Sequence, residues 1–349
     1  MKSELLRSFG TKIKTLREKR GLSQNELSQL CNFKREYISK IENGSSNVTI
    51  ETIQKLANSL NIKMSQLLED NNDLKSKPFV KWAGGKNQIL NKLIEFIPKE
   101  FNRYYEPFIG GGALLFNLKP NTIIINDSNK ELMYAYQCFL DKYKLNKLIK
   151  ELEMHELNHS EEYYYQVRNL DQSNSFEKLK DYQRAARLIY LNKACFNGLY
   201  RVNSKGFYNT PYGNKQKINA FDKENFLDIY KYFSISNVAI KNEDFEECVK
   251  DAKKGDFVYF DPPYDSYTDK NSFTNYDSKK FGKDEQIRLR NVALKLSKRG
   301  VKVMLSNHNT PFINELYKDF NKHVIEARRI INSDAKRRGN VEELIITNF

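Results

Sequence analysis

The sequence predicts an α/β fold in a large second domain, preceded by a small all-α domain. Apolar residues before about residue 70 recur only at helical spacing, whereas from residue 78 onward short apolar runs alternate with helical stretches. One such run, Phe257–Phe260, is stopped at its carboxyl end by two prolines, as is typical of a buried strand. We therefore expect domains at residues 1–70 and 78–349, joined by a polar linker at residues 71–77.

The composition limits the classes of function. The chain of 349 residues carries 58 Lys and Arg against 44 Asp and Glu, a net charge of +14, which favours nucleic acid as a partner. Its four cysteines are scattered, and no apolar run approaches the ~18 residues that a membrane span needs. We expect a soluble protein of the reducing cytoplasm, with no membrane partner and no disulfide framework.

The first seventy residues are predicted to form a bundle of short helices. Gly21 ends the first helix, and Ser23 with Glu26 forms a capping box that opens the second. A third helix spans residues 34–41, and Thr49 caps the next one. Two short helices joined by a tight turn inside a bundle form the helix-turn-helix arrangement.

Residues 22–44 resemble the phage-repressor-like (Cro/C1-type, XRE-like) helix-turn-helix domains. The resemblance implies that Ile38 and Ile41 face the core. It places on or beside a DNA-recognition helix the residues Lys34, Arg35, Glu36, Tyr37, Ser39 and Lys40. The alternative is a helical bundle that serves protein contacts or dimerisation.

A glycine turn and an acidic residue predict a site for a nucleoside-containing cofactor. The glycines of the turn Phe108–Gly112 allow a ligand to approach the backbone closely, and the next strand, Thr122–Asn126, ends in Asp127. An acidic residue at the end of the second strand is where a ribose hydroxyl pair is held. Upstream, Gly85-Lys86 is no phosphate loop, because Asn87 replaces the required Ser or Thr.

The tetrapeptide Asp261–Tyr264 suits chemistry on an exocyclic amine. Asp261 can accept one N–H of an amino group, and the Pro262 carbonyl can accept the other. Tyr264 offers a ring on which a flipped base can stack. The alternative is an ordinary exit from a strand into a turn.

His155–His159 matches the HExxH zinc pattern. We interpret the match as coincidence, because only His308 and His323 remain as distant third ligands, and we predict no metal. Residues 190–215 mix aromatic, amide and basic side chains, a composition suited to reading base edges, although an ordinary hairpin would also explain it. Further strands are expected at Asn237–Lys241, Val301–Leu305 and Leu344–Phe349.

From residue 78 the chain resembles the α-group (Dam/DpnM-type, D12 class) DNA adenine-N6 methyltransferases. The blocks that carry the resemblance are Lys81–Lys86, Glu106–Gly112, Asn126-Asp127, Asp244-Phe245, Asp261–Tyr264, Ser306-Asn307 and Arg328-Arg329. The family implies a Rossmann-like, S-adenosylmethionine-dependent methyltransferase sheet with a helical and hairpin target-recognition insertion at about residues 135–235. It implies S-adenosylmethionine held by Trp82, Lys86, Phe108, Gly110, Gly112, Asp127, Asp244 and Asp261. The resemblance also implies that Asp261, Pro262 and Tyr264 act in catalysis on a flipped adenine.

Family members that act on GATC carry a hairpin like Phe196–Arg201. By that likeness the residues that contact double-stranded DNA are Lys81, Phe196, Asn197, Leu199, Arg201 and Pro211, with Arg201 on a guanine and Phe196 beside the vacated adenine. We expect a monomer or weak dimer of a restriction-modification system whose first domain reads an operator. The alternatives are a repressor with a non-catalytic methylase-like module, and amino methylation of cytosine or RNA.

Overall fold

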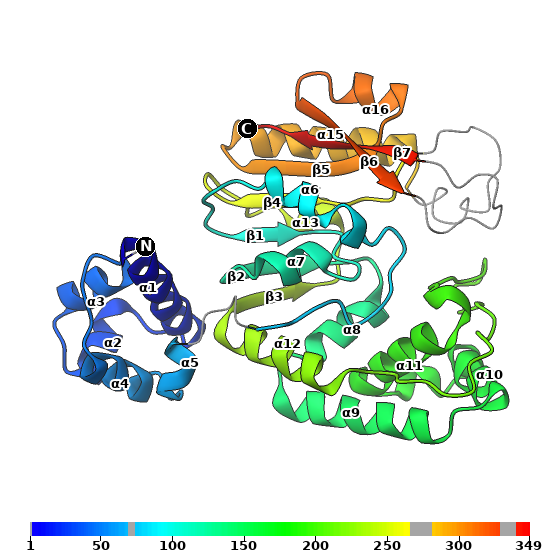
Figure 1. The fold of residues 1–349 in the computed structure, drawn as a ribbon, viewed down its shortest axis with the longest axis horizontal. Helices are drawn as coiled ribbons and strands as arrows, with labels where there is room; N and C mark the ends of the chain where they lie inside the picture. The colour runs from blue at the N-terminus through cyan, green and yellow to red at the C-terminus, as the bar shows by residue number, and fades with distance from the viewer. Residues whose placement is uncertain (1, 69–73, 266–280, 329–339) are drawn as a thin grey trace.

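The structure is a computed structural model that describes residues 2–68, 74–265, 281–328 and 340–349 (Figure 1). A small helical domain lies beside a larger α/β domain. Arg329 of the last resemblance block and residues 71–73 of the expected linker lie outside the described residues. No helix in the described part of the chain is long and apolar enough to cross a membrane. The four cysteines are all free and buried.

The helical domain confirms the predicted helix-turn-helix arrangement. Its helices are α1 (Lys2–Lys19), α2 (Gln24–Cys31), α3 (Arg35–Glu42), α4 (Ile50–Ser59) and α5 (Met64–Leu68). The capping box forms, with Ser23 Oγ accepting from Glu26 N at 3.2 Å and Glu26 Oε2 accepting from Ser23 N at 2.6 Å. Ile38 and Ile41 are buried in a core of their own, as predicted.

The α/β domain is built on a sheet with the strand order β3-β2-β1-β4-β5-β7-β6. The strands are β1 (Tyr104–Glu106), β2 (Thr122–Asn126), β3 (Asn237–Lys241), β4 (Phe257–Phe260), β5 (Lys302–His308), β6 (Asn321–Arg328) and β7 (Asn340–Thr347). The first five are parallel, and β7 pairs antiparallel with both β5 and β6. Strands β2, β3 and β4 match their predicted bounds, whereas β6 was not predicted.

Alternating side chains bury both faces of the sheet. Tyr104, Phe257 and Tyr259 point into one core, and Tyr105 and Val258 point into the other. The first core is covered by α7 (Ala113–Leu118), α8 (Lys130–Cys138), α9 (Lys142–Leu157), α11 (Asp181–Ala194) and α12 (Lys223–Ile235). The second is covered by α13 (Phe245–Cys248), α15 (Lys283–Lys298) and α16 (Pro311–Leu316). The sheet is therefore enclosed between two layers of helices.

The remaining short helices connect these layers. They are η2 (Lys86–Gln88), α6 (Leu90–Glu95), α10 (Glu161–Asn169), η3 (Leu170–Gln172), η4 (Phe176–Lys178) and η5 (Phe196–Gly198). The described end of the expected linker packs on α12, because Asn225 Oδ1 accepts from Lys77 N at 2.8 Å and Leu74 is buried in the first core. These residues belong to the packed α/β domain.

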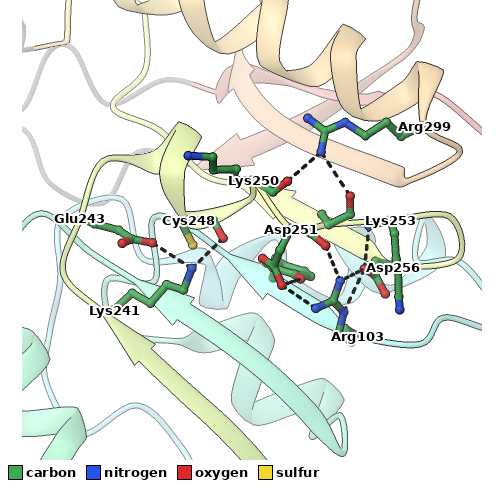
Figure 2. A network of polar contacts seen from close by, with 11 residues as sticks. Arg103, Lys241, Glu243, Cys248, Lys250, Asp251, Lys253, Asp256 and Arg299 are labelled. Atoms are coloured by element: carbon green, nitrogen blue, oxygen red, sulfur yellow. Dashed lines mark hydrogen bonds and ion pairs between the residues drawn. The ribbon is translucent and has the colours of Figure 1, made fainter.

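An ion-pair network ties the start of β1 to the start of β4 (Figure 2). Arg103 Nη2 donates to the buried Asp256 carboxylate at 2.7 Å, and Arg103 Nη1 donates to Asp251 at 2.6 Å. A buried carboxylate needs such a partner, since an uncompensated charge in the interior is costly. The network fixes β1 beside β4, where the order of the strands reverses. Ligands in open α/β sheets bind at the carboxyl side of this reversal.

Candidate active site and DNA-reading surface

The predicted catalytic tetrapeptide leaves the carboxyl end of β4 at the reversal point. Lys86 Nζ lies 2.8 Å from Asp261 Oδ1, with 7% and 18% of the two side chains exposed. The same ammonium group donates to Gly84 O at 2.6 Å and lies 4.6 Å from the centroid of the Tyr264 ring. Lys86, Asp261 and Tyr264 therefore share one partly enclosed site.

Electrostatics at this site favour a carboxylate that is easily protonated. Burial raises the pKa of Asp261 to about 6, against the opposing effect of the Lys86 ammonium, and the negative charge of Glu343 adds to the rise. The Tyr264 hydroxyl donates to Glu343 Oε2 at 2.9 Å. Glu343, on β7, thus orients the tyrosine ring, and no local sequence signal marks it.

Two buried amides hold the chain as it leaves β4. Gln286 Nε2 donates to Pro263 O at 2.8 Å, and Gln286 Oε1 accepts from Asn307 Nδ2 at 3.0 Å. Asn307 Oδ1 in turn accepts from Asp265 N at 2.9 Å. Gln286 and Asn307 are at most 1% exposed. Of the two, the sequence singled out only Asn307, within a resemblance block.

The glycine turn lies against Trp82 and Tyr136. A Cβ on Gly110 would stand 2.8 Å from Trp82 Cδ1, and one on Gly112 would stand 2.7 Å from the Tyr136 hydroxyl. Both glycines also have positive φ, 48° and 73°. Side chains at these positions would push the indole and the phenol away, so the close packing requires glycine. Trp82 is itself half-buried and stacks on Tyr200, with ring centroids 5.2 Å apart.

Asp127 meets the glycine turn, as expected. Its Oδ2 accepts from Gly110 N at 3.1 Å, and its Oδ1 accepts from Asn129 N at 2.9 Å. A carboxylate held by backbone donors at the end of β2 is oriented for a diol. Asp127 therefore lies at the carboxyl edge of the sheet, where the spacing argument expects it.

The more distant cofactor candidates lie along the same edge. Asp244 caps α13 after the end of β3 and forms an ion pair with Arg288. The Phe108 ring lies 5.4 Å from the Phe245 ring and 5.6 Å from the Phe281 ring. An acidic residue next to a cluster of phenylalanine rings suits a nucleobase that carries an amino group.

A buried acid ends β1, just before the glycine turn. Glu106 is 3% exposed, and its Oε2 accepts from the Tyr104 hydroxyl at 2.8 Å. Burial raises the pKa of Glu106 well above its ordinary range, and the charge of Asp261 adds to the rise. The family resemblance included Glu106 in a sequence block without giving it a role. A raised pKa favours the neutral form of this buried acid.

The predicted DNA-reading hairpin forms between residues 195 and 212 with only two isolated bridges. Phe196 lies at the base of the hairpin, where its N donates to Pro211 O at 3.0 Å, and is 53% exposed. Asn197 beside it adopts a left-handed conformation with φ 56°. Arg201 is exposed, and its guanidinium donates to Asn209 Oδ1 at 2.7 Å. Of the other predicted DNA contacts, Lys81, Asn197 and Pro211 are exposed and Leu199 is half-buried.

A buried asparagine joins the hairpin to the Lys81 segment. Asn192 Oδ1 accepts from Lys81 N at 2.9 Å, and its Nδ2 donates to Lys81 O at 2.8 Å and to Gly198 O at 2.9 Å. Asn192 is 1% exposed. It therefore holds two segments that are both predicted to read DNA, although nothing in its local sequence marks it.

The HExxH histidines serve as hydrogen-bonding groups within the insertion. His155 Nδ1 lies 2.8 Å from the Tyr163 hydroxyl, His159 Nδ1 lies 3.0 Å from the Tyr190 hydroxyl, and His159 Nε2 lies 2.8 Å from Lys215 O. Across the residues that the structure describes, no three His, Cys, Asp or Glu side chains form a group able to hold a metal ion.

The predicted recognition helix of the first domain, α3, presents most of the residues that the resemblance named. Lys34, Arg35 and Lys40 are exposed, and Tyr37 is half-buried against the Phe33 ring at 5.3 Å. The buried Glu42 at the end of this helix accepts from Arg17 Nε at 2.6 Å. This buried pair fixes α3 against α1.

Comparisons with known proteins agree with this geometry. Residues 82–331 match the family described as D12 class N6 adenine-specific DNA methyltransferase, and residues 13–67 match a helix-turn-helix family. The type II methyltransferase M1.LlaDCHI of Lactococcus lactis is 43% identical over 80% of this chain and 97% of its own. The type II methyltransferase M.MjaIII of Methanocaldococcus jannaschii is 42% identical over 78% and 99%.

The DNA adenine methylase of Escherichia coli K12 is 32% identical over 78% of this chain and 95% of its own length. The methyltransferase match spans well over half of the chain, and the helix-turn-helix match lies outside it. These matches agree with the two architectures that the structure shows. The chain therefore belongs to the D12 class of N6 adenine-specific DNA methyltransferases and carries an additional N-terminal helix-turn-helix domain of the Cro/C1 type.

Proposed function

We propose that this methyltransferase transfers a methyl group from S-adenosylmethionine to N6 of an adenine that has been flipped out of double-stranded DNA. The target that we propose is GATC. The observation that carries the proposal is the placement of Asp261, which stands at the reversal point of the sheet beside Lys86 and Tyr264. A carboxylate there can accept a hydrogen bond from an amine while a neighbouring ring stacks on the base.

The residues at the carboxyl edge have the chemistry that S-adenosylmethionine needs. Asp127 suits the ribose hydroxyls, Asp244 with the Phe108 ring suits the cofactor adenine, and the turn from Gly110 to Gly112 suits close backbone approach. Trp82 packs on that turn, and Lys86 pairs with Asp261 just after the carboxyl end of β4. When bound, S-adenosylmethionine supplies an electrophilic methyl group on a sulfonium.

The chain's own contribution is to orient the amine. Asp261 and the Pro262 carbonyl would accept hydrogen bonds from the two N6 hydrogens and so hold the amine in one orientation, with its nitrogen lone pair free to react. Gln286 holds the following peptide through Pro263 O at 2.8 Å, so this acceptor pair is fixed before the base arrives. Tyr264, held through its hydroxyl by Glu343, supplies the stacking surface.

The hairpin supports GATC as the target. The exposed Arg201 can donate twice to a guanine edge, and the exposed Phe196 ring can fill the gap that the flipped adenine leaves. Lys81 lies next to the hairpin, since a Cβ on Gly198 would stand 2.7 Å from Lys81 Cδ. We infer that Lys81 contacts the outer guanine.

The first domain supports a regulatory role. Exposed basic residues beside and along α3 suit a second, distinct DNA sequence, which we propose is an operator. A methyltransferase that also reads an operator fits a restriction-modification system, in which expression of the methylating activity has to be timed.

The decisive experiment is methylation of matched duplexes with methyl-labelled cofactor. We expect N6-methyladenine in a GATC duplex and none in a duplex whose GATC is changed to GTTC. Asp261→Ala should abolish turnover and leave DNA binding intact. Label in both duplexes would reject the GATC assignment, and cofactor binding without label in either would support a repressor with a non-catalytic module.

A further inference from the structure

The helix-turn-helix domain is joined to the α/β domain by a lysine that binds three carbonyl oxygens. Lys19 Nζ, at the end of α1, donates to Phe233 O at 3.0 Å, Ser234 O at 3.0 Å and Ser236 O at 3.1 Å. These carbonyls lie at the carboxyl end of α12, where the helix dipole is negative and favours a cation. The three carbonyl oxygens therefore fix the position of the lysine ammonium group, and the negative end of the helix dipole stabilises its charge.

This lysine contact lies at the edge of the sheet opposite the active site. Ser236 immediately precedes Asn237, the first residue of β3, which pairs with Thr122, the first residue of β2. Asp261 follows the last residue of β4. Because these strands are parallel, the helix-turn-helix domain meets the amino edge and the catalytic site occupies the carboxyl edge.

Both DNA-reading surfaces are open at the same time. Lys34, Arg35 and Lys40 are exposed with the α/β domain in place, and so are Phe196 and Arg201 on the hairpin. Figure 1 shows α1 lying between α3 and the sheet, so the recognition helix faces away from the α/β domain. Nothing in the described chain covers either surface.

We propose that one chain holds two separate duplex segments at once, an operator on α3 and a GATC site on the hairpin, and so bridges or loops DNA. The proposal rests on the proposed function of both domains. One short duplex cannot touch both surfaces, because the α/β domain lies between them and DNA is stiff below its persistence length of about 150 bp. The Lys19 contact sets the angle between the two segments.

The first test captures two duplexes on one chain. The full chain is first used to enrich a binding sequence from random duplexes that lack GATC. A GATC duplex is then immobilised, loaded with the protein and S-adenosylhomocysteine, and challenged with the enriched duplex carrying a fluorescent label. We expect retained label and, in sedimentation, a complex of one chain with two duplexes.

Variants assign each duplex to its surface. Arg35→Ala should lose the labelled duplex and keep the immobilised one, and Arg201→Ala should weaken the immobilised one. If each duplex binds alone and displaces the other, or if no sequence is enriched, the bridging proposal is overturned. A methylation assay on the same preparation separates this result from failure of the proposed function, which would appear as no product.

The second test measures whether the angle between the two bound DNA segments is fixed. Operator and GATC are placed on one DNA more than about 150 bp apart, and their spacing is varied in single base pairs over about two helical turns of about 10.5 bp. We expect the initial methylation rate to oscillate with that period, and Lys19→Met to flatten the oscillation without changing methylation of a short GATC duplex. The exposed Lys14→Met is the matched control. A wild-type rate independent of spacing would overturn the fixed geometry.

Discussion

Lys86 Nζ lies 2.8 Å from Asp261 Oδ1 and 4.6 Å from the centroid of the Tyr264 ring. The lysine therefore presents N–H groups to the same carboxylate and the same aromatic ring that we assign to the N6 amine of adenine. Its ammonium balances the charge of Asp261 while no base is in the site. We expect an entering base to compete with Lys86 for this carboxylate.

This ion pair predicts the acid limb of the pH profile. The pKa of Asp261 is raised to about 6, so kcat/KM for DNA should fall as the pH drops through about 6, where the carboxylate becomes protonated and stops accepting N–H groups. Lys86→Met removes a charge that lowers the pKa of Asp261, and its acid limb should lie at higher pH. Measurement at saturating cofactor gives both profiles.

Lys86→Arg is the control for that prediction. Because arginine keeps the positive charge, its acid limb should stay near that of the wild type even where its rate is lower. An unchanged limb in Lys86→Met would show that the group that titrates near pH 6 is not Asp261.

Gln286→Leu should lower kcat more than it raises KM for either substrate. The leucine leaves Pro263 O and the Asn307 amide without their partner, at a cost of about 1–3 kcal/mol, and loosens the acceptor pair that orients N6. We expect kcat to drop about tenfold or more. Gln54→Leu, a change of an exposed glutamine on α4, should leave kcat unchanged. If Gln286→Leu lowers thermal stability and leaves kcat unchanged, Gln286 stabilises the fold and does not position the acceptor pair.

Arg201 should carry the discrimination at one guanine. Arg201→Ala is expected to cost about 1–3 kcal/mol of preference for that base, read as the ratio of kcat/KM on GATC and on a singly changed site. Asn209→Ala should lower the same ratio by a smaller factor, since Asn209 Oδ1 holds the guanidinium at 2.7 Å. An equal loss of kcat/KM on both DNA sequences would show that Arg201 contacts phosphate and does not read a base.

Local patterns were sufficient for much of the fold. The apolar runs that became β2, β3 and β4 are continuous and bounded by turn residues, and the capping box at Ser23 was visible in four residues. Strand β6 has no such pattern, because it lies at the edge of the sheet and Ile325 is the only buried residue among its residues 321–326. Its pairing with β7 is a tertiary effect that local spacing does not record.

The positioning residues of the site escaped sequence reasoning for a related reason. Asn192 contacts a residue 111 positions away in the chain, and Glu343 contacts one 79 positions away. The positions of Asp127 and Asp261 could be predicted from the sequence, because the carboxyl ends of neighbouring parallel strands meet at one edge of the sheet. Which distant amide or acid completes their surroundings depends on how the helical layers pack, and single-sequence patterns carry no information about that packing.

The insertion should respond to acid through His155. Its ring stacks on Tyr190 with centroids 4.8 Å apart, and burial together with the charge of Arg187 lowers its pKa from 6.5 to about 4. Between about pH 6.5 and pH 4, His155 binds a proton in the unfolded chain but stays neutral in the folded chain. The free energy of unfolding should therefore fall as the pH drops from about 6.5 to about 4, by at most about 3 kcal/mol from this residue.

His155→Phe isolates that effect, because phenylalanine keeps the stacking on Tyr190 and has no proton to bind. Urea unfolding of both proteins at pH 7, 6, 5 and 4 gives two stability curves, and the variant's curve should fall less steeply below pH 6.5. The variant starts from a lower value, since it loses the hydrogen bond between His155 and Tyr163. Parallel curves would contradict the prediction and show that the ring is protonated in the folded protein as readily as in the unfolded one.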